Sequence, residues 1–334
     1  MKIDFQHKQS AHCENGVTSN LLNYYGIKLS EPMVFGIGSG YFFSHMPFYK
    51  LNGMPVTSFR VLPGWIFKRV THRLGIKVER KKFTNPDSSM KELDDLLNKG
   101  IPTGMLVGVF QLPYFPKEYR FHFNAHNLTV FGRENGHYLI SDPIMEHIET
   151  LTYDELVRVR FAHGTYPPKG RMYHITHVPK NIDINSAIIT GINKTAKDML
   201  GIPVPMFGIK GIRFLAKRMR TWPEKYGQKM AILNLGQVIR MLEEIGTGGA
   251  GFRFIYAAFL QESAERLNKR WLNDVSVEMT ATGDAWREFA VMAARCFKNR
   301  DNANITYDSL ADRLMYIADR EEHVFQQLKD ISVR

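Results

Sequence analysis

Three residues that lie far apart in the chain are of the types that cysteine-based catalysis requires. Cys13 lies near the start, and His126 and Asp142 follow much later. A cysteine nucleophile needs a base within hydrogen-bond reach and a third group that orients this base. We therefore expect Cys13 to act as the nucleophile, His126 as the base and Asp142 as the orienting group, and we ask which elements could bring them together.

The residues after Cys13 predict a helix that begins at the cysteine. Apolar side chains recur over 21–25, and Gly26 suits the position just after a helix end. The sulfur would then lie at the positive end of the helix dipole, which favours the thiolate over the thiol. The alternative is a small buried thiol with a packing role, because free cysteines are often buried.

A predicted hairpin brings His126 and Asp142 near each other. Strands are predicted over 126–132 and 137–141, with an Asn-Gly turn between them. His126 begins the first strand and Asp142 follows the second. Paired strands lie about 5 Å apart, so the two side chains can meet at one sheet edge. Asp142 also precedes a proline, and a purely structural turn role is its alternative.

Other polar residues compete for roles at such a site. His122 lies four residues before His126, so in an extended strand both would point to the same face, and His122 is the alternative base. Gln9, Ser39 and His122 are candidates to line the pocket or to stabilise an oxyanion. Ser39 has no histidine or acid arranged locally to activate it as a nucleophile. A metal site built from the two histidines and a carboxylate is a further alternative, although we expect no bound metal.

Composition places the chain among ordinary globular proteins. Its 334 residues allow one large domain or two ordinary ones, with 44% hydrophobic and 23% charged residues. No apolar run reaches the roughly 18 residues of a membrane-spanning helix, and the first ten residues lack the apolar centre of a signal peptide. Two cysteines cannot build a disulfide framework, so we expect a reduced cytoplasmic protein.

The net charge of +11 suggests an anionic partner. Basic residues are concentrated in two stretches, 68–82 and 210–229. Such patches attract nucleic acid, an anionic membrane surface or an acidic protein, or they simply form a solvated face. No zinc-ligand spacing, helix-turn-helix or aromatic RNA-binding motif accompanies them, which disfavours nucleic acid.

The order of predicted elements indicates an α+β protein with two domains, 1–178 and 179–334. The first part mixes helices with strands predicted over 76–79, 105–112, 119–125, 126–132, 137–141, 148–151 and 171–176. The second part contains only helical patterns, predicted over 184–200, 207–220, 229–245, 252–268, 284–297 and 309–331. Near the cysteine helix, Gly36, Gly38 and Gly40 are expected to allow close backbone packing beside it and to line a pocket.

The chain also resembles known families. The first half resembles the papain-like fold of C39-type peptidases through Cys13, Tyr24-Tyr25-Gly26, the His126 strand and Asp142-Pro143. It is more similar to the butirosin biosynthesis acyltransferase family, its "protein H" N-terminal domain, through His12-Cys13, Leu21-Leu22, Gly26, Leu29-Ser30-Glu31 and Phe35 to Gly40. The second half resembles the helical domain that commonly follows it, through residues 248–253, Tyr256 and Phe259-Leu260.

This resemblance implies a papain-like catalytic domain and an N-acyltransferase. Such an enzyme takes an acyl group from the phosphopantetheine thioester of an acyl carrier protein and places it on a small-molecule amine, in specialised metabolite or lipid biosynthesis. One departure concerns the oxyanion donor: papain-like peptidases usually have a glutamine six positions before the cysteine, where this chain has His7 between Gln6 and Gln9. The alternatives are a cysteine peptidase or amidase on the same three residues, and a non-catalytic binding protein with the same fold.

Overall fold

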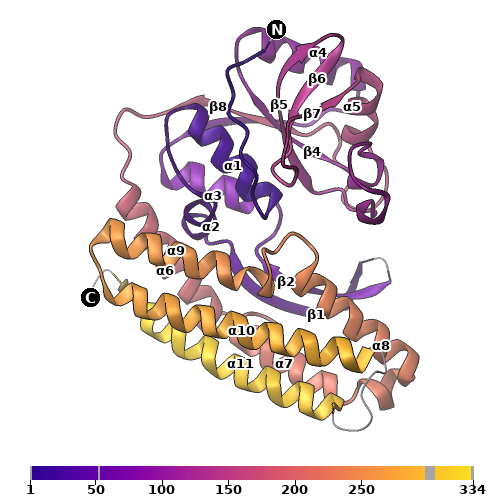
Figure 1. Ribbon diagram of the computed structural model, residues 1–334, viewed down its shortest axis with the longest axis vertical. Coiled ribbons are helices and arrows are strands. Elements are labelled where there is room, and N and C mark those ends of the chain that lie inside the picture. The colour runs from indigo at the N-terminus through magenta and orange to yellow at the C-terminus, as the bar shows by residue number, and fades with distance from the viewer. Residues whose placement is uncertain (1, 52, 298–304, 332–334) are drawn as a thin grey trace. The chain divides into compact units, whose positions relative to one another are not determined.

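The computed structural model describes residues 2–51, 53–297 and 305–331 of an α+β chain (Figure 1). The chain forms two compact units. Unit 1 comprises Met1–Val34 and Phe67–Ile182, and unit 2 comprises Phe35–Ile66 and Asp183–Arg334. This division differs from the expected 1–178 and 179–334, because unit 2 includes a segment from the first half of the chain.

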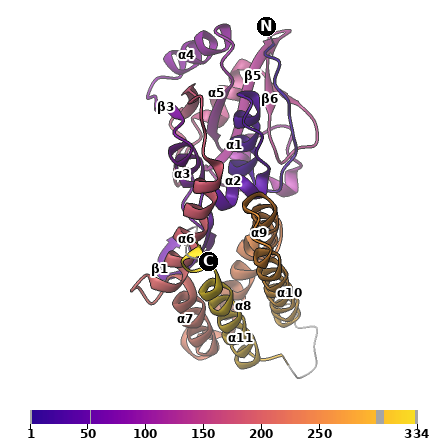
Figure 2. The ribbon, with the colours of Figure 1, turned by 90° about the vertical axis from the view of Figure 1, so that its left-hand side faces the viewer.

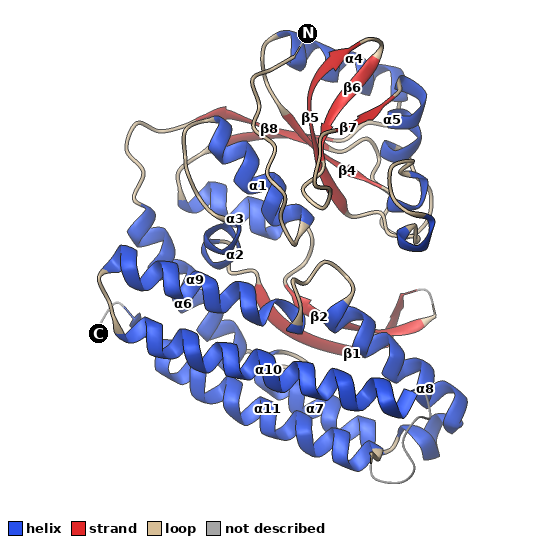
Figure 3. Cartoon of the chain, viewed as in Figure 1, coloured by secondary structure: helices blue, strands red, loops and turns tan. Residues whose placement is uncertain are grey.

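Unit 1 is built on a six-stranded antiparallel sheet, drawn in red in Figure 3. The strands lie in the order β3-β8-β4-β5-β6-β7. Their bounds are Lys77–Lys81 (β3), Thr103–Val107 (β4), His126–Glu134 (β5), His137–Ser141 (β6), Glu149–Leu151 (β7) and Met172–His177 (β8). The central strand β4 is buried along its whole length. Residues that β5 and β8 direct toward the same face can therefore meet across it.

Unit 1 contains helices α1 (Cys13–Tyr24), α4 (Pro86–Asn98) and α5 (Tyr153–Arg160), and helices α2 (Glu31–Ile37) and α3 (Trp65–Arg73) lie across its boundaries with unit 2 in the chain. Helix α1 packs against β5 and is buried from Cys13 to Leu22. The predicted helix start at Cys13 is confirmed. Its predicted end is confirmed as well, because Gly26 follows the C-cap Tyr25 with a φ of 82°, a left-handed conformation that glycine adopts at low cost.

The predicted hairpin is confirmed in detail. Asn135 and Gly136 both have positive φ, 51° and 81°, as the tight turn between twisted antiparallel strands requires. Pairing of β5 with β6 brings Thr129 opposite Ser141. Asp142, which follows Ser141, is thereby held near the beginning of β5.

The expected strand over 119–125 is wrong, and the strand expected over 105–112 is shorter than predicted. Strand β4 ends at Val107, and a short 3-10 helix covers Val109–Gln111. The backbone N–H of Gly108 donates to Val159 O, and that of Val109 donates to Phe123 O. These bonds pull the chain out of the sheet ladder, so residues 108–125 form a long connection that returns to the sheet at His126.

Unit 2 contains the six predicted helices: α6 (Ile184–Gly201), α7 (Gly208–Arg220), α8 (Trp222–Glu243), α9 (Arg253–Leu267), α10 (Trp271–Phe297) and α11 (Tyr307–Leu328). Helices α10 and α11 run side by side in both views (Figures 1 and 2). An antiparallel hairpin of β1 (Tyr41–Leu51) and β2 (Met54–Arg60) packs against α7 and α8. The strand pattern in this hairpin did not emerge from the sequence.

In the glycine-rich segment before β1, Gly36 packs closely against elements of unit 2. A Cβ on Gly36 would lie 2.1 Å from the Phe259 ring of α9. A Cβ on Gly191 of α6 would lie 2.5 Å from the backbone oxygen of Gly36. Only glycine leaves room for these two close approaches. The two glycines therefore allow the backbone at Gly36 to pack closely against α6 and α9.

A charged pair is buried at the centre of unit 2. The Arg253 guanidinium donates from Nε and Nη2 to Glu321 Oε1 at 2.9 and 2.7 Å. The indole of Trp286 donates to the same oxygen at 2.6 Å. The guanidinium also lies over the Tyr41 ring, 4.5 Å from its centroid. Arg253, Glu321 and Trp286 are fully buried.

The second basic stretch is partly neutralised by α11. Arg213 pairs with Asp319 and Glu322, each at 2.6 Å. Arg220 pairs with two further α11 carboxylates, those of Asp308 and Asp312. The lysines of this stretch remain exposed: Lys210, Lys217, Lys225 and Lys229. Within the described ranges, no helix is both long enough and apolar enough to cross a membrane.

Candidate active site

Two side chains hold the backbone at the start of α1, the buried His12 and the partly exposed Glu31. His12 is the N-cap, and its ring accepts a hydrogen bond from Asn15 N at 3.4 Å. The Glu31 carboxylate accepts from the backbone N–H groups of Ala11 and His12 at 2.9 and 2.8 Å. Cys13, which is 6% exposed, is therefore presented from a fixed backbone at the helix N-terminus. The dipole of α1 favours a negatively charged sulfur there.

His126 lies between Cys13 and Asp142. Its Nε2 and the Asp142 Oδ2 are 2.7 Å apart, and both side chains are buried. The imidazole also interacts with the Cys13 sulfur by a hydrogen bond and by charge. Because Nε2 is bonded to the carboxylate, Nδ1 is the ring nitrogen left to face the sulfur. The structure thus brings together all three residues that the sequence indicated.

The charges around His126 determine its protonation. Burial lowers the pKa of His126, but the negative charges of Asp142 and Cys13 and hydrogen bonds to both raise it from 6.5 to about 10. The positively charged imidazolium is therefore the favoured form of His126 at neutral pH. An imidazolium beside a thiolate is the resting arrangement that activates a cysteine nucleophile.

Both carboxylate oxygens of Asp142 accept hydrogen bonds from neighbours other than His126. Its Oδ2 also accepts from the Tyr114 hydroxyl at 2.9 Å, and its Oδ1 accepts from Ile144 N at 3.1 Å. Tyr114 belongs to the 108–125 connection, which also places the Phe115 ring edge-on to His126, with centroids 5.5 Å apart. The loop that replaces the expected strand thus supports the His126–Asp142 pair.

The N-terminal segment fastens the turn after Asp142. His7 bonds through Nδ1 with Ser141 Oγ at 2.8 Å and donates from Nε2 to Met145 O at 3.1 Å. Ser10 N donates to Pro143 O at 2.7 Å. The residue at the usual glutamine position, His7, is therefore engaged in holding this turn.

Asn127 is a polar neighbour of the sulfur that sequence reasoning missed. Its Nδ2 lies 3.9 Å from Cys13 Sγ, within hydrogen-bond range for sulfur, and its Oδ1 accepts from the Tyr173 hydroxyl at 2.9 Å. The available signal was a second polar residue directly after His126, in the buried part of a strand. Buried polar side chains need partners, so such a residue points to a local network.

The remaining candidates lie in other environments. Gln9 donates to Ile144 O at 3.4 Å, at an exposed position. Ser39 belongs to unit 2, where its hydroxyl donates to Gly191 O at 3.1 Å. The exposed His122 stacks on Phe110, with ring centroids 4.1 Å apart. Among the described residues, no group of three or more His, Cys, Asp or Glu side chains is placed to hold a metal ion.

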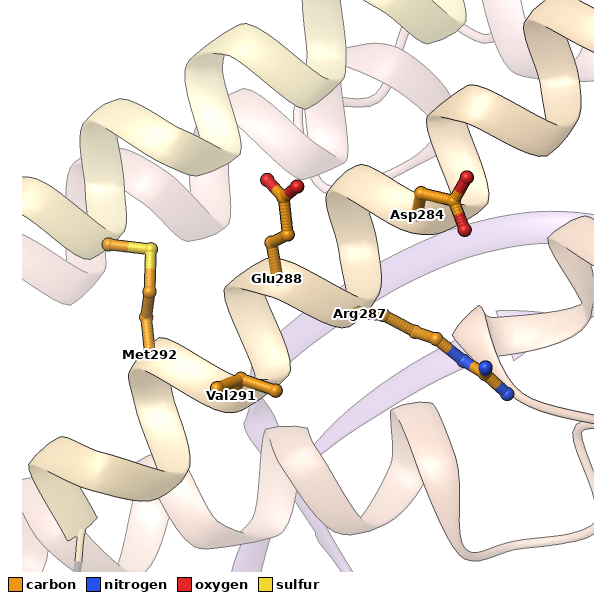
Figure 4. Close-up of a pocket in the computed structure, with 5 residues that line it drawn as sticks. All are labelled: Asp284, Arg287, Glu288, Val291 and Met292. Atoms are coloured by element: carbon orange, nitrogen blue, oxygen red, sulfur yellow. The ribbon is translucent and has the colours of Figure 1, made fainter.

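Unit 2 has a shallow hollow along α10, with a volume of about 550 Å³ (Figure 4). It is lined by Asp284, Arg287, Glu288, Val291 and Met292. Glu288 pairs with Arg313, and the Arg287 guanidinium lies 4.8 Å from the centroid of the Phe254 ring. Two charged groups of the hollow are thus engaged within the unit, and no nucleophile is among its lining residues.

Comparisons with known proteins find family matches in two parts of the chain. Residues 12–143 match the family described as butirosin biosynthesis protein H, N-terminal, and residues 154–328 match the family described as domain of unknown function DUF4872. A similar solved structure is that of a protein described as a C39-like peptidase from Bacillus anthracis. It has 13% identity, covers 54% of this chain and 100% of its own, and has a TM-score of 0.38. No match is found among curated proteins.

The first of these two families matches the residues that contain Cys13, His126 and Asp142. The second matches more than half of the chain. The chain therefore belongs to the DUF4872 family, and its residues 12–143 are similar to the N-terminal part of butirosin biosynthesis protein H.

Proposed function

We propose that the protein is an N-acyltransferase that carries its acyl group on Cys13. The observation that supports this most is the His126 imidazole placed between the Cys13 sulfur and the Asp142 carboxylate. A thiolate, an imidazolium and an orienting acid are the groups needed for acyl transfer through a covalent intermediate. The similarity to butirosin biosynthesis protein H favours biosynthesis as the setting, in specialised metabolite or lipid pathways.

In the first half-reaction, the Cys13 thiolate attacks the carbonyl carbon of an acyl thioester. The carbon–sulfur bond to the donor breaks, and the leaving thiolate takes the proton of the His126 imidazolium. An acyl-Cys13 thioester and a free donor thiol result. The two thioesters are of similar energy, so little driving force is lost at this step.

Acylation also prepares His126 for the second half-reaction. The thiolate charge is one of the groups that raise the pKa of His126, and it disappears when Cys13 is acylated. The neutral imidazole can then accept the proton of an attacking amine. The amine nitrogen bonds to the acyl carbon, the Cys13–carbon bond breaks, and the amide leaves with the thiolate restored.

The proposed donor is an acyl group on the phosphopantetheine arm of a carrier protein. Carrier proteins are acidic, and the exposed lysines of α7 and α8 offer a complementary positive surface. Replacing Lys210 and Lys217 by glutamate should raise the KM for the loaded carrier, most strongly at low ionic strength. Lys91→Glu on α4 is the matched control. Equal kinetics in both variants at low salt would remove this surface from the proposal.

Intact-mass spectrometry after incubation with an acyl-loaded carrier tests the central proposal. We expect a mass increase equal to the acyl group, its absence in Cys13→Ala, and its loss when a suitable amine is added. A nucleophilic thiol must stay reduced, so we propose that the protein acts in the reducing cytoplasm. Cleavage of peptides or amides without acyl transfer to amines would favour a peptidase or amidase. Full activity of Cys13→Ala in the cell would favour a binding role.

A further inference from the structure

The Asn127 side chain has one N–H directed at the reacting sulfur. Its Nδ2 donates to Ala125 O at 3.3 Å and to Cys13 Sγ at 3.9 Å, while its Oδ1 accepts from Tyr173. A backbone carbonyl can only accept, so the nitrogen must be the atom that faces Ala125. The opposite orientation of the amide would place two oxygens against each other. The hydrogen-bond partners thus determine which end of the amide faces Cys13.

Tyr173 holds the amide in this orientation. It lies on β8 directly opposite Gly104 of β4, and a Cβ on Gly104 would be 2.3 Å from the Tyr173 ring. The glycine therefore lets the ring lie flat across β4, so that its hydroxyl reaches Asn127 on β5. The Phe67 ring also packs against the Tyr173 ring, with centroids 4.6 Å apart. Burial raises the pKa of Tyr173 well above its usual value, so the hydroxyl keeps its proton and remains a donor.

A donor in this position has a second use when Cys13 is acylated. When the sulfur attacks an acyl thioester, the carbonyl oxygen of that thioester becomes an oxyanion. This oxyanion is attached to the carbon that the sulfur has just bonded. An oxyanion forms next to the sulfur, where a fixed N–H group can bind it. The glutamine that usually supplies this bond is absent, and His7 at its position holds the turn after Asp142.

We infer that Asn127 is the side-chain oxyanion donor of this site and that Tyr173 is its positioning residue. The inference rests on the proposed acylation of Cys13. In the resting state the Asn127 N–H is directed at the thiolate. In the tetrahedral intermediate the same N–H donates to the oxyanion. This hydrogen bond is lost when the leaving thiolate departs and the carbonyl group forms again. The proton of the leaving group still comes from His126, so the two residues act on different atoms.

Two reactions of Cys13 separate this role from others. Acylation by p-nitrophenyl acetate forms an oxyanion and releases a burst of p-nitrophenolate, whereas alkylation by iodoacetamide displaces iodide without forming one. We expect Asn127→Leu, which keeps the shape and removes the donor, to slow the burst by about 10²–10³-fold. Alkylation of Cys13 should change only slightly. Tyr173→Phe should show a smaller loss of the same kind, and Cys13→Ala should show no burst.

The control for the tyrosine is Tyr138→Phe, which removes a hydroxyl bonded to Asp94 on the same sheet. It should leave both reactions unchanged. Equal losses of acylation and alkylation in Asn127→Leu would overturn the inference, because the amide would then act on the thiolate or on the fold. An unchanged burst, or no Cys13-dependent burst in the wild type, would also overturn it. The small ester makes the test independent of the carrier protein, so failure of carrier-dependent transfer would be seen separately.

Discussion

Each unit of this chain contains a buried charged cluster, and the two clusters differ in what they leave available. In unit 2, Arg253 and Glu321 are fully buried and bonded to each other, with Trp286 on the same carboxylate oxygen. In unit 1, Asp142 and His126 form a comparable pair, but the imidazole also meets the sulfur of Cys13. Only the cluster in unit 1 contains a nucleophile.

Because both clusters are buried and charged, burial and charge alone do not identify a site. The Arg253 guanidinium is enclosed by aromatic rings, among them Tyr41 and Trp286, and its charge is used in holding the helices of unit 2 to the β1–β2 hairpin. The Asp142 carboxylate is equally well bonded, yet its bonds orient a group that can exchange a proton. The distinction lies in whether the network ends on an atom that can form a new bond.

Removing the nucleophile should give the largest effect and tests the comparison most directly. Cys13→Ala should reduce amide formation by at least about 10⁴-fold, because the residues of such a site act as a unit. The melting temperature should change little, since alanine fills most of the volume of the thiol. Comparable activity in the variant would mean that the unit 1 cluster is as structural as that of unit 2.

Removing the charge that orients His126 should have the next largest effect. Asp142→Asn should lower the rate of acyl transfer by about 10³–10⁴-fold, because the neutral amide no longer stabilises the imidazolium. The pKa of His126 should fall below its value of about 10. Iodoacetamide alkylation of Cys13 measured across pH would report the shift, and an unchanged profile would contradict the assigned role.

Breaking the pair in unit 2 should instead cost stability. Arg253→Leu leaves Glu321 buried without its cation, and we expect a loss of about 3–5 kcal/mol in the free energy of unfolding. Urea denaturation measures it, and alkylation of Cys13 below the transition serves as the activity readout. The double variant with Glu321→Leu should recover part of the loss. A single variant that is stable but inactive would reverse the roles of the two clusters.

The His126 cluster should also make stability depend on pH. The pKa of His126 is raised in the folded protein, so its contribution to stability is complete below its ordinary value of 6.5 and is lost as the pH rises through about 10. The difference in melting temperature between the wild type and His126→Gln should therefore shrink over this range. A difference that grows toward pH 10 would contradict the imidazolium.

An exposed ion pair should give the smallest effect. Arg213 joins α7 to Asp319 and Glu322 of α11 at a partly exposed position. Arg213→Ala should cost less than about 1 kcal/mol, since solvent screens exposed pairs and ordering the long side chains of a pair costs conformational entropy. Urea denaturation beside Arg253→Leu gives the direct contrast. A loss as large as that of the buried pair would show that surface charge holds the helices of unit 2 together.

Much of this architecture could be predicted from local sequence. The start of α1 at Cys13, the Asn135-Gly136 turn and six helices in the second half all agree with the structure. Each depends on residues within a few positions of one another. Turn, cap and periodicity signals are local, so they can be recognised in a single sequence.

Other features depend on partners that are distant in sequence. Strands are predicted over 105–112 and 119–125, but residues 108–125 form a connection in which Gly108 and Val109 bond to Val159 and Phe123 rather than to a sheet neighbour. The segment Phe35–Ile66 joins unit 2 because the glycines at 36 and 191 admit large or close partners there. No local signal specifies which distant surface a chain segment will pack against.

The site shows the same division between sequence and tertiary structure. Residue type and order along the chain were enough to select Cys13, His126 and Asp142, because nucleophile, base and acid each need a specific functional group. The role of His7 in the turn after Asp142, and the approach of Asn127 to the sulfur under the hold of Tyr173, were decided by the tertiary structure. Those contacts join residues from separate elements, and the directions of their hydrogen bonds exist only once the sheet and α1 have packed together.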